Sequence, residues 1–341
     1  MKSRSLTVAL GGLLVAALIQ TPGNAQAPSP QASAAQGGGR GQGAAPANET
    51  LSQSYRGSKA RDWEFQKTAP IKVFDNLYYV GPGNVSVWLL QTTDGLMVFD
   101  ATQEPLVDHV LDSIRKVGFN PADIRYIFLT HGHLDHFGGA GKLKAAAPKA
   151  RIATLEEDWA LIDTFYKNVA SGAAAKNPNA RDPGIPFSRD LVIKESDVIT
   201  LGKTQVHVYK LPGHTAGSPT FTFTVYDNGR PHKAVLFGGP GQRNGVEGGT
   251  QFLESIRRLK NGKEFADVEV PVHVHSWLTT YPDERGGTVF EPAMQLAKRQ
   301  PGQPHPFVIP AMWKKWLDRA EAGTIKYVEE AKAGKAAPVG N

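Results

Sequence analysis

The 341-residue chain contains no cysteine. Disulfides are therefore excluded, and a metal site in this protein has to use imidazole and carboxylate ligands instead of thiolates. A large excess of one charge is also missing, because the formal net charge is only +6 and the basic residues are scattered along the chain. This distribution indicates a soluble protein and gives no sign of nucleic-acid binding.

No apolar run is long enough to cross a membrane comfortably. The main one, residues 6–19, follows a positively charged start and precedes a small-residue cleavage motif that ends at Ala27. This pattern is typical of a secretory signal peptide, and a retained membrane anchor is the alternative. We predict a signal peptide over residues 1–27, a periplasmic or secreted location and no membrane association after cleavage.

The segment that follows has few large apolar residues. Residues 28–49 are rich in Ala, Gly, Gln and Pro, a composition that cannot bury enough surface to fold. We predict a disordered tether over residues 28–60 and a single domain over residues 61–341, the latter ending in a C-terminal helix.

Two strand-rich halves make up this domain, and each contains helices. Short β-branched and aromatic runs predict the strands, and apolar spacing of three to four residues predicts the helices. Strands are expected at 71–80, 85–91, 96–100, 124–129, 151–154, 191–194, 198–201, 205–211, 220–226, 234–237 and 268–274, and helices at 104–117, 140–147, 155–169, 250–260 and 310–331. The order predicts an α/β (α+β) fold in which two sheets pack face to face with helices outside, a four-layer αββα sandwich.

The stretch from Thr130 to His136 reads Thr-His-Gly-His-Leu-Asp-His and follows a predicted strand. His131 and His133 are two residues apart, so that in an extended loop their side chains point the same way. Asp135 and His136 follow at once and can reach a second point close by. Imidazole and carboxylate suit zinc, so one short loop can serve two adjacent metal ions; the alternative is a solvated polar loop.

Further histidines lie at the ends of later predicted strands. His214 sits in a Gly- and Pro-rich turn, which presents one imidazole. His273 and His275 end the strand at 268–274 and, at i and i+2, share a face, so either can reach a metal while the other supports a ligand. No comparable setting surrounds the remaining histidines His109, His207, His232 and His305.

These motifs resemble the metallo-β-lactamase superfamily, and most closely its third subclass of metallo-β-lactamases, whose two zinc sites use only His and Asp. The resemblance covers about residues 61–282, and further matching features are Trp63 ahead of Ala69-Pro70, residues 75–81, Asp94-Gly95, residues 121–129 and residues 212–218. It implies two Zn²⁺ per chain. One zinc would be bound by His131, His133 and His214, and the other by Asp135, His136 and a late histidine, His273, with His275 in reserve.

Two features of this family are missing from the chain. Many superfamily hydrolases, such as glyoxalase II-like thioesterases, lactonases and phosphodiesterases, place a metal-bridging aspartate after the strand at 234–237. Here that strand is followed by Gly238-Gly239-Pro240-Gly241, which favours the lactamase pattern. The third subclass also has serines here that hold the substrate carboxylate. This chain has none, and Arg243 or Asn244 would have to substitute.

The resulting hypothesis is an exported hydrolase that opens β-lactams, small cyclic amides, by a zinc-bound hydroxide, with Asp135 as the catalytic residue that orients the water. Such an activity would confer antibiotic resistance. A related amide, ester or lactone hydrolase is the alternative, and a degenerate binding protein without catalysis is a third. A serine hydrolase is not favoured, because no Gly-x-Ser-x-Gly motif stands at a strand–helix turn. The sequence does not indicate an oligomeric state.

Residues 170–189 interrupt the pattern. They hold Gly, Pro, Asn and Ala with little periodicity, and a loop of this length in a compact domain is usually functional or mobile. We expect either a lid over the metals or a surface insertion. Trp63 either lines the mouth of the cleft or packs the N-terminal segment on the core.

Overall fold

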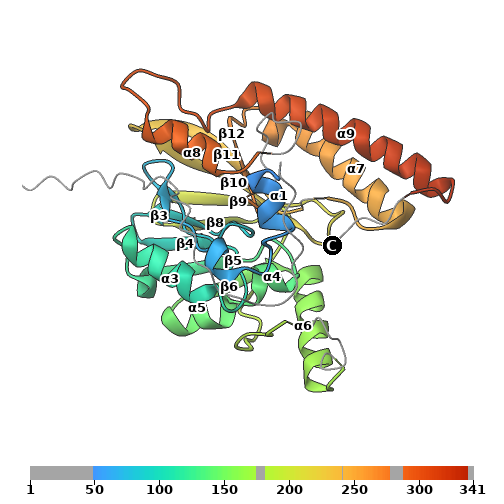
Figure 1. Ribbon diagram of the computed structural model, residues 1–341, viewed down its shortest axis with the longest axis horizontal. Coiled ribbons are helices and arrows are strands. Elements are labelled where there is room, and N and C mark those ends of the chain that lie inside the picture. Colours follow the sequence, from blue (N-terminus) through green and yellow to red (C-terminus); the bar gives the residue numbers. More distant parts are fainter. Residues whose placement is uncertain (1–48, 174–180, 240, 277–286, 337–341) are drawn as a thin grey trace, which may run out of the picture. The chain divides into compact units, whose positions relative to one another are not determined.

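The computed structural model describes residues 49–173, 181–239, 241–276 and 287–336 (Figure 1). The predicted signal peptide at 1–27 and most of the predicted tether lie outside these ranges. Among the described residues, no helix is both long and apolar enough to cross a membrane.

Seven strands form the first sheet, and they pair in the order in which they occur along the chain. The pairs from β1 to β4 are antiparallel, whereas β4 to β7 run parallel. Their bounds are β1 Ile71–Lys72, β2 Leu77–Tyr79, β3 Trp88–Thr92, β4 Gly95–Phe99, β5 Ile124–Phe128, β6 Arg151–Leu155 and β7 Leu191–Ile193. Because β4, β5 and β6 are parallel neighbours, the segments that follow them meet at one edge of this sheet.

The second sheet has five strands in the order β12-β11-β10-β9-β8. All pairs are antiparallel except β11 with β12, which is parallel. The bounds are β8 Val198–Leu201, β9 Thr204–Lys210, β10 Pro219–Asp227, β11 Arg230–Phe237 and β12 Val270–His273. Alternation decides which face is buried. In β9, Val206 and Val208 are fully buried between the sheets, while Gln205 and His207 point to the other face.

Helices cover the outer faces of both sheets, as Figure 1 shows. Helices α3 (Val107–Lys116), α5 (Ala140–Ala146) and α6 (Glu156–Ala170) lie on the first sheet, and α7 (Gly245–Asn261) and α9 (Pro310–Lys332) on the second. Three apolar clusters separate these layers: one between the sheets around Phe99 and Phe221, one under α3, α5 and α6, and one under α7 and α9. The predicted four-layer αββα sandwich is confirmed.

The predicted tether ends earlier than residue 60. Helix α1 (Leu51–Arg56) begins with a reciprocal capping box between Thr50 and Gln53. Tyr55 is buried, and its ring packs 5.1 Å from Phe65 and 5.5 Å from Phe290. The tether boundary at 60 is therefore wrong, because one aromatic side chain and a cap are enough to dock this short segment on the domain. Trp63 begins the next short helix, α2 (Trp63–Gln66), and is half-buried.

Other short elements were not predicted. They are α4 (Leu134–Phe137), α8 (Phe290–Ala297) and two 3₁₀ turns, η1 (Pro121–Asp123) and η3 (Lys263–Phe265). The interrupting segment is anchored where it is described: Phe187 packs against Phe137 and Trp159, and Arg189 forms ion pairs with carboxylates of α6. Its central part, residues 174–180, lies outside the described residues, so the lid remains a prediction.

Candidate metal centre

The loop that carries the Thr130–His136 motif begins where β5 ends. Thr130 is buried, and both its backbone N–H (2.8 Å) and its hydroxyl (2.7 Å to Oδ2) donate to the carboxylate of Asp100. Asp100 follows directly after β4, the parallel neighbour of β5. One buried carboxylate therefore fixes the start of the loop, and the remaining residues wind into α4, whose first turn contains Asp135 and His136.

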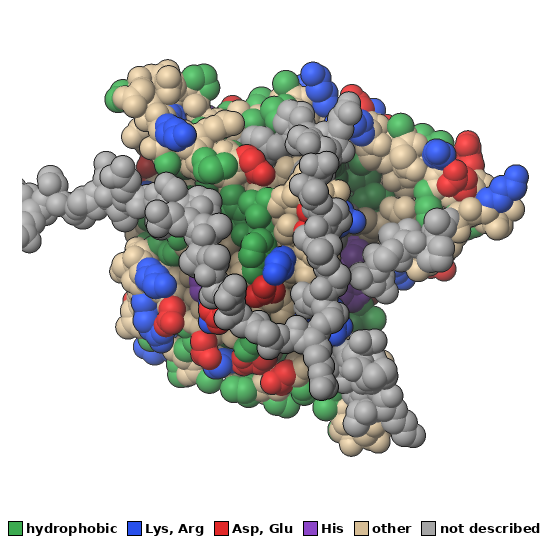
Figure 2. All heavy atoms as spheres, viewed as in Figure 1, with side chains coloured by type: hydrophobic (Ala, Val, Ile, Leu, Met, Phe, Trp, Pro, Cys, Tyr) green, Lys and Arg blue, Asp and Glu red, His purple; other side chains and the backbone are tan. Residues whose placement is uncertain are grey.

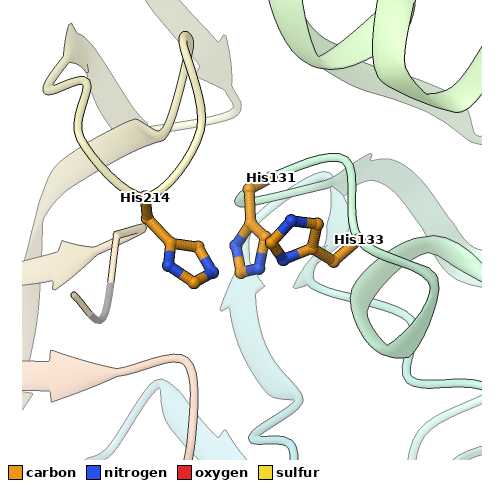
Figure 3. Close-up of side chains that lie close together, drawn as sticks. All are labelled: His131, His133 and His214. Atoms are coloured by element: carbon orange, nitrogen blue, oxygen red, sulfur yellow. The ribbon is translucent and has the colours of Figure 1, made fainter. Parts of the chain in front are cut away.

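Three histidines from two loops form the first cluster, which we call the three-histidine cluster (Figure 3). His131 and His133 come from the loop after β5, and His214 comes from the loop between β9 and β10. The ring of His131 lies 4.8 Å from that of His133 and 4.5 Å from that of His214, measured between centroids. One ligand nitrogen of each residue lies within 4.8 Å of the other two. Loops from both sheets thus contribute side chains to the three-histidine cluster.

Asp135, His136 and His275 form the second cluster, which we call the aspartate cluster. Their ligand atoms also lie within 4.8 Å of one another. His275 reaches this cluster from beyond β12, where it forms an isolated bridge with Val85. The two clusters adjoin, because the rings of His131 and His136 are 3.8 Å apart between centroids. Six ligand-type side chains therefore surround two neighbouring points, an arrangement typical of a dinuclear centre.

Hydrogen bonds fix the ring orientation of three of these histidines. Nδ1 of His131 lies 3.0 Å from the carbonyl oxygen of Gly238, Nδ1 of His136 lies 2.8 Å from Oδ2 of Asp100, and Nδ1 of His275 lies 3.2 Å from the carbonyl oxygen of Asn84. Each partner is an acceptor, so Nδ1 carries the proton and donates it. The lone pair of each ring is therefore on Nε2, which points into the clusters.

The positions of the Nε2 atoms suit a role as metal ligands. Nε2 of His131 is buried without a hydrogen-bond partner. Nε2 of His136 and Nε2 of His275 lie 3.2 Å apart. Without a metal, a proton on one of these nitrogens forms a hydrogen bond to the other. The separation is also close to the ~3.3 Å expected of two nitrogens around a tetrahedral zinc with Zn–N bonds of about 2.0–2.1 Å. The donor set, imidazole and carboxylate without sulfur, also suits zinc.

The electrostatics of the clusters differ from ring to ring. Burial, followed by the neighbouring imidazoles, lowers the pKa of His131 well below its ordinary value and that of His214 to about 3. Burial opposes charge on His136 too, but Asp100 and Asp135 outweigh it and raise the pKa. Burial likewise disfavours ionised Asp135, but His136 and His275 outweigh it and lower the pKa of this carboxyl to about 2.

The structure places the reserve candidate His275, and not the predicted late ligand His273, in the aspartate cluster. His273 is the last residue of β12, and its ring lies under α9, 5.7 Å from the ring of Trp316. Its Nε2 is buried without a partner, and burial lowers its pKa to about 3. The two histidines diverge because the strand ends between them, so the i, i+2 rule for a shared face no longer holds.

Two buried carboxylates support the site and were missed in the sequence. Asp100 holds Thr130 and His136, as described above. Asp158, in the first turn of α6, accepts hydrogen bonds from the backbone N–H of Gly132 and of Ser218, each at 2.9 Å. Burial raises its pKa to about 6. Their place in the sequence could have identified them. Both residues follow strands that are parallel neighbours of β5, at the edge of the sheet where the motif begins.

The first residue after β11 has no room for a side chain. A Cβ atom at Gly238 would lie 2.0 Å from the carbonyl oxygen of Pro219, so no side chain fits at this position, and the carbonyl of Gly238 holds His131 instead. Arg243 turns its guanidinium toward α7, where it donates to Gln251 and lies 3.8 Å from Glu247. Its backbone N–H donates to Gly213 beside His214. A role of Arg243 or Asn244 toward a substrate remains a prediction.

The other four histidines lie outside both clusters, as expected. His305 stacks on Phe74 with ring centroids 4.1 Å apart, and His232 is paired with Glu269 at 2.9 Å. His109 accepts from the backbone of Thr68, and His207 points to the outer face of β9. On the face of the molecule in Figure 2, acidic and basic side chains are interspersed, and histidine side chains reach the surface.

The fold brings two groups of side chains that could each hold a metal ion together at loops of the two sheets. The model of the metallo-beta-lactamase superfamily matches residues 80–226, which contain the motif and His214. Over these residues, which carry five of the six side chains of the two clusters, the chain is similar to this superfamily.

Solved structures of metallo-β-lactamases share this fold. The native FEZ-1 metallo-beta-lactamase from Legionella gormanii is 23% identical with a TM-score of 0.66, over 79% of this chain and 98% of that one. BJP-1, a subclass B3 metallo-beta-lactamase of Bradyrhizobium japonicum, is 24% identical with a TM-score of 0.64, over 81% of this chain and 98% of that one. At these identities the likeness concerns the fold.

Curated relatives with sequence similarity carry a different name. A hydroxyacylglutathione hydrolase of Bdellovibrio bacteriovorus is 31% identical over 173 residues, which are 48% of this chain and 57% of that protein. One from Buchnera aphidicola is 28% identical over 115 residues, 34% of this chain and 36% of that protein. The chain thus spans between about a third and somewhat over half of the length of these relatives.

Proposed function

We propose that this protein is a zinc-dependent hydrolase with two metal ions per chain. His131, His133 and His214 would hold one ion, and Asp135, His136 and His275 the other. The observation that carries the proposal is the convergence of six ligand side chains, with Nε2 atoms aimed inward by partners on Nδ1. A purely structural role would leave the buried Nε2 of His131 without a hydrogen-bond partner among the described residues, which is costly unless a ligand compensates.

When bound, two zinc ions would supply Lewis acidity toward a carbonyl oxygen and make a water molecule more acidic. The protein supplies orientation and charge. Asp135 is ionised at neutral pH, because its pKa is about 2, so its carboxylate can accept a hydrogen bond from the attacking water or take up its proton. Asp100 holds His136 in one orientation, so that the aspartate cluster does not rearrange during turnover.

The substrate class we favour is the β-lactams, which are cyclic amides. Support comes from the fold of the lactamases described above and from the sequence Gly-Gly-Pro-Gly after β11, which contains no carboxylate to bridge two metals. An alternative substrate class is thioesters or esters. It is supported by the hydroxyacylglutathione hydrolases, which match this chain at higher identity than the lactamases but over a smaller part of it.

Parallel hydrolysis assays separate the two classes. Nitrocefin, a p-nitrophenyl ester and a glutathione thioester are offered to the chain from Pro28 onward, first with added zinc and then with EDTA. We expect zinc-dependent opening of nitrocefin, lost with EDTA and restored by zinc. Turnover of the thioester or the ester without nitrocefin turnover would exclude the β-lactam assignment and keep the hydrolase. Equal turnover with and without EDTA would contradict the metal dependence.

Export is part of this proposal. The positive start, apolar run and cleavage motif over residues 1–27 support it, and β-lactams act on targets outside the inner membrane. Expression of the full chain in a Gram-negative host, followed by fractionation and N-terminal sequencing, tests it. We expect a periplasmic product that begins at Pro28. A product that retains Met1 and stays with the membranes would contradict export.

A further inference from the structure

The three-histidine cluster depends on the distance between two loops from different sheets. His131 and His133 follow β5 of the first sheet, whereas His214 lies between β9 and β10 of the second. Figure 3 shows His214 approaching the other two rings from the opposite side. A shift of one sheet relative to the other would therefore separate the ligands of this cluster. The third residue of the aspartate cluster, His275, also comes from the second sheet, but from beyond β12 and not from the loop that presents His214.

Asp158 joins these two loops directly. Its Oδ1 accepts from the N–H of Gly132, which lies between His131 and His133, and its Oδ2 accepts from the N–H of Ser218, both at 2.9 Å. The side chain is fully buried. A charge-assisted hydrogen bond to a backbone amide is stronger than a neutral one, and in a buried setting it also holds its geometry. One carboxylate thus bridges the two sheets at the ligand loops.

The loop around His214 is shaped to receive this carboxylate. A Cβ atom on Gly217 would lie 2.0 Å from Oδ2 of Asp158, so only glycine leaves room for the carboxylate. Within the same loop, Ser218 and Thr215 exchange hydrogen bonds of 2.8–2.9 Å, which make the turn rigid. A displacement of Asp158 is therefore transmitted to the whole turn that presents His214.

From this geometry we infer that Asp158 is a positioning residue that sets the separation of the two ligand loops and thereby the metal affinity of the three-histidine cluster alone. The inference rests on the proposed metal centre. Supporting residues around metal ligands typically change metal affinity about 10–100-fold when they are removed, and we expect an effect of this size.

Two parent proteins make the test specific. His275→Ala leaves only the three-histidine cluster intact, and His214→Ala leaves only the aspartate cluster. Asp158→Asn is introduced into each, and zinc affinity is measured by competition with a chromophoric chelator. Asparagine keeps the shape but turns one acceptor into a donor that faces an N–H. We expect about 10–100-fold weaker binding in the first parent and no change in the second.

A buried residue of the same helix provides the structural control. Ile162 is buried in the apolar cluster under α6, and Ile162→Ala should destabilise the helix by leaving a cavity. We expect it to lower the unfolding midpoint without weakening zinc binding to the three-histidine cluster. Equal loss of affinity in Ile162→Ala and Asp158→Asn would overturn the inference, as would unchanged affinity in Asp158→Asn.

A double-mutant cycle keeps the inference testable if Asp158→Asn does not fold. Gly217→Ala places a methyl group against the carboxylate and should weaken zinc binding, whereas in an Asp158→Ala background the clash is gone and the same change should cost little. Gly323→Ala, with nothing within 4 Å of the added carbon, is the matched control. If the effects of Gly217→Ala and Asp158→Ala on zinc affinity are additive, the inferred coupling between Asp158 and the turn that presents His214 would be overturned. Absence of zinc binding in the His275→Ala parent would overturn the metal centre itself.

Discussion

The two ligand clusters use the same imidazole chemistry but have different partners. In the three-histidine cluster, His131 donates to the neutral carbonyl of Gly238, and its pKa is lowered well below the ordinary value. In the aspartate cluster, His136 donates to the carboxylate of Asp100, and its pKa is raised. The ring centroids of the two residues are only 3.8 Å apart. Burial and the neighbouring imidazoles lower the pKa of His131, whereas Asp100 and Asp135 outweigh burial and raise the pKa of His136.

This difference indicates separate tasks for the two clusters. The three-histidine cluster is neutral without metal, so it offers three lone pairs and no charge of its own. The aspartate cluster includes the ionised carboxylate of Asp135, and the side chain of Asp100 lies directly behind His136. Negative charge there stabilises a cation and also leaves an acceptor beside the reacting water. The substitutions below test this asymmetry, beginning with the largest expected effect.

Removing the charge of Asp135 should have the largest effect. Asp135→Asn keeps the size of the side chain but removes its ability to take up a proton, so we expect kcat to fall about 10²–10⁴-fold on whichever substrate the protein turns over. Circular dichroism and thermal unfolding should show an intact fold. Asp163→Asn, which only breaks a surface ion pair with Arg189, is the control and should leave kcat unchanged. Near-normal turnover by Asp135→Asn would refute the role.

His273 and His275 allow a direct comparison, because both are buried histidines and only His275 lies in the aspartate cluster. His275→Ala removes a ligand of the aspartate cluster, and we expect zinc binding there to weaken by more than the roughly 100-fold that a supporting residue costs. His273→Ala removes a ring that lies under α9, so it should lower the unfolding midpoint while both clusters still bind zinc. Metal content after dialysis against a weak chelator distinguishes them. The opposite pattern would restore His273 as the ligand.

Asp100→Asn should remove the carboxylate that accepts the hydrogen bond from His136, a feature that distinguishes the aspartate cluster from the three-histidine cluster. Its amide nitrogen would face the donating Nδ1 of His136, which must then change tautomer or move, while its oxygen can still accept from Thr130. We expect zinc affinity in the aspartate cluster to fall about 10–100-fold and affinity in the three-histidine cluster to change less. Competition titrations in the His214→Ala and His275→Ala parents give the two values. An equal loss in both would mean that Asp100 acts through the fold of the loop.

The metal-free protein should show the smallest effect, a difference in pH dependence. The pKa of His214 is about 3 in the folded chain against an ordinary 6.5, so the unfolded chain takes up this proton first as the pH falls. Its contribution to stability is complete above pH 6.5 and is lost as the pH falls toward 3. The raised pKa of His136 has the opposite sign: stability is complete below the ordinary pKa and is lost as the pH rises through the raised one.

Urea unfolding of the EDTA-treated protein across this range measures the contribution of His214. The free energy of unfolding of His214→Asn should decline less steeply than that of the wild type between pH 6.5 and 3. Parallel curves would contradict the assignment.

Much of the fold could be predicted because its strands alternate or are continuously apolar. The alternation of β9 and the buried runs of β4 and β5 indicate two-sided packing, and the helix from Pro310 begins at the predicted residue. The motif from Thr130 to His136 is local, so its ligands could be read without knowing the fold. Helix α1 was missed because six residues have little periodicity, and its docking depends on Phe290, far away in the sequence.

Some parts of the site could not be predicted from the sequence, because they depend on contacts between elements that are far apart along the chain. The choice between His273 and His275 is made by the end of β12 and by Trp316 of α9, and neither is visible in the local pattern. Asp158 stands in the first turn of a helix, where acidic residues are common because they favour the helix dipole. Its partners Gly132 and Ser218 identify it only when two sheets are brought together.

The most direct test of a dinuclear centre is anomalous diffraction at the zinc absorption edge from crystals grown with zinc. We expect two peaks per chain, one contacted by His131, His133 and His214 and the other by Asp135, His136 and His275, in agreement with the two clusters. A structure without an anomalous peak at these residues, or with a peak contacted by His273, would contradict it.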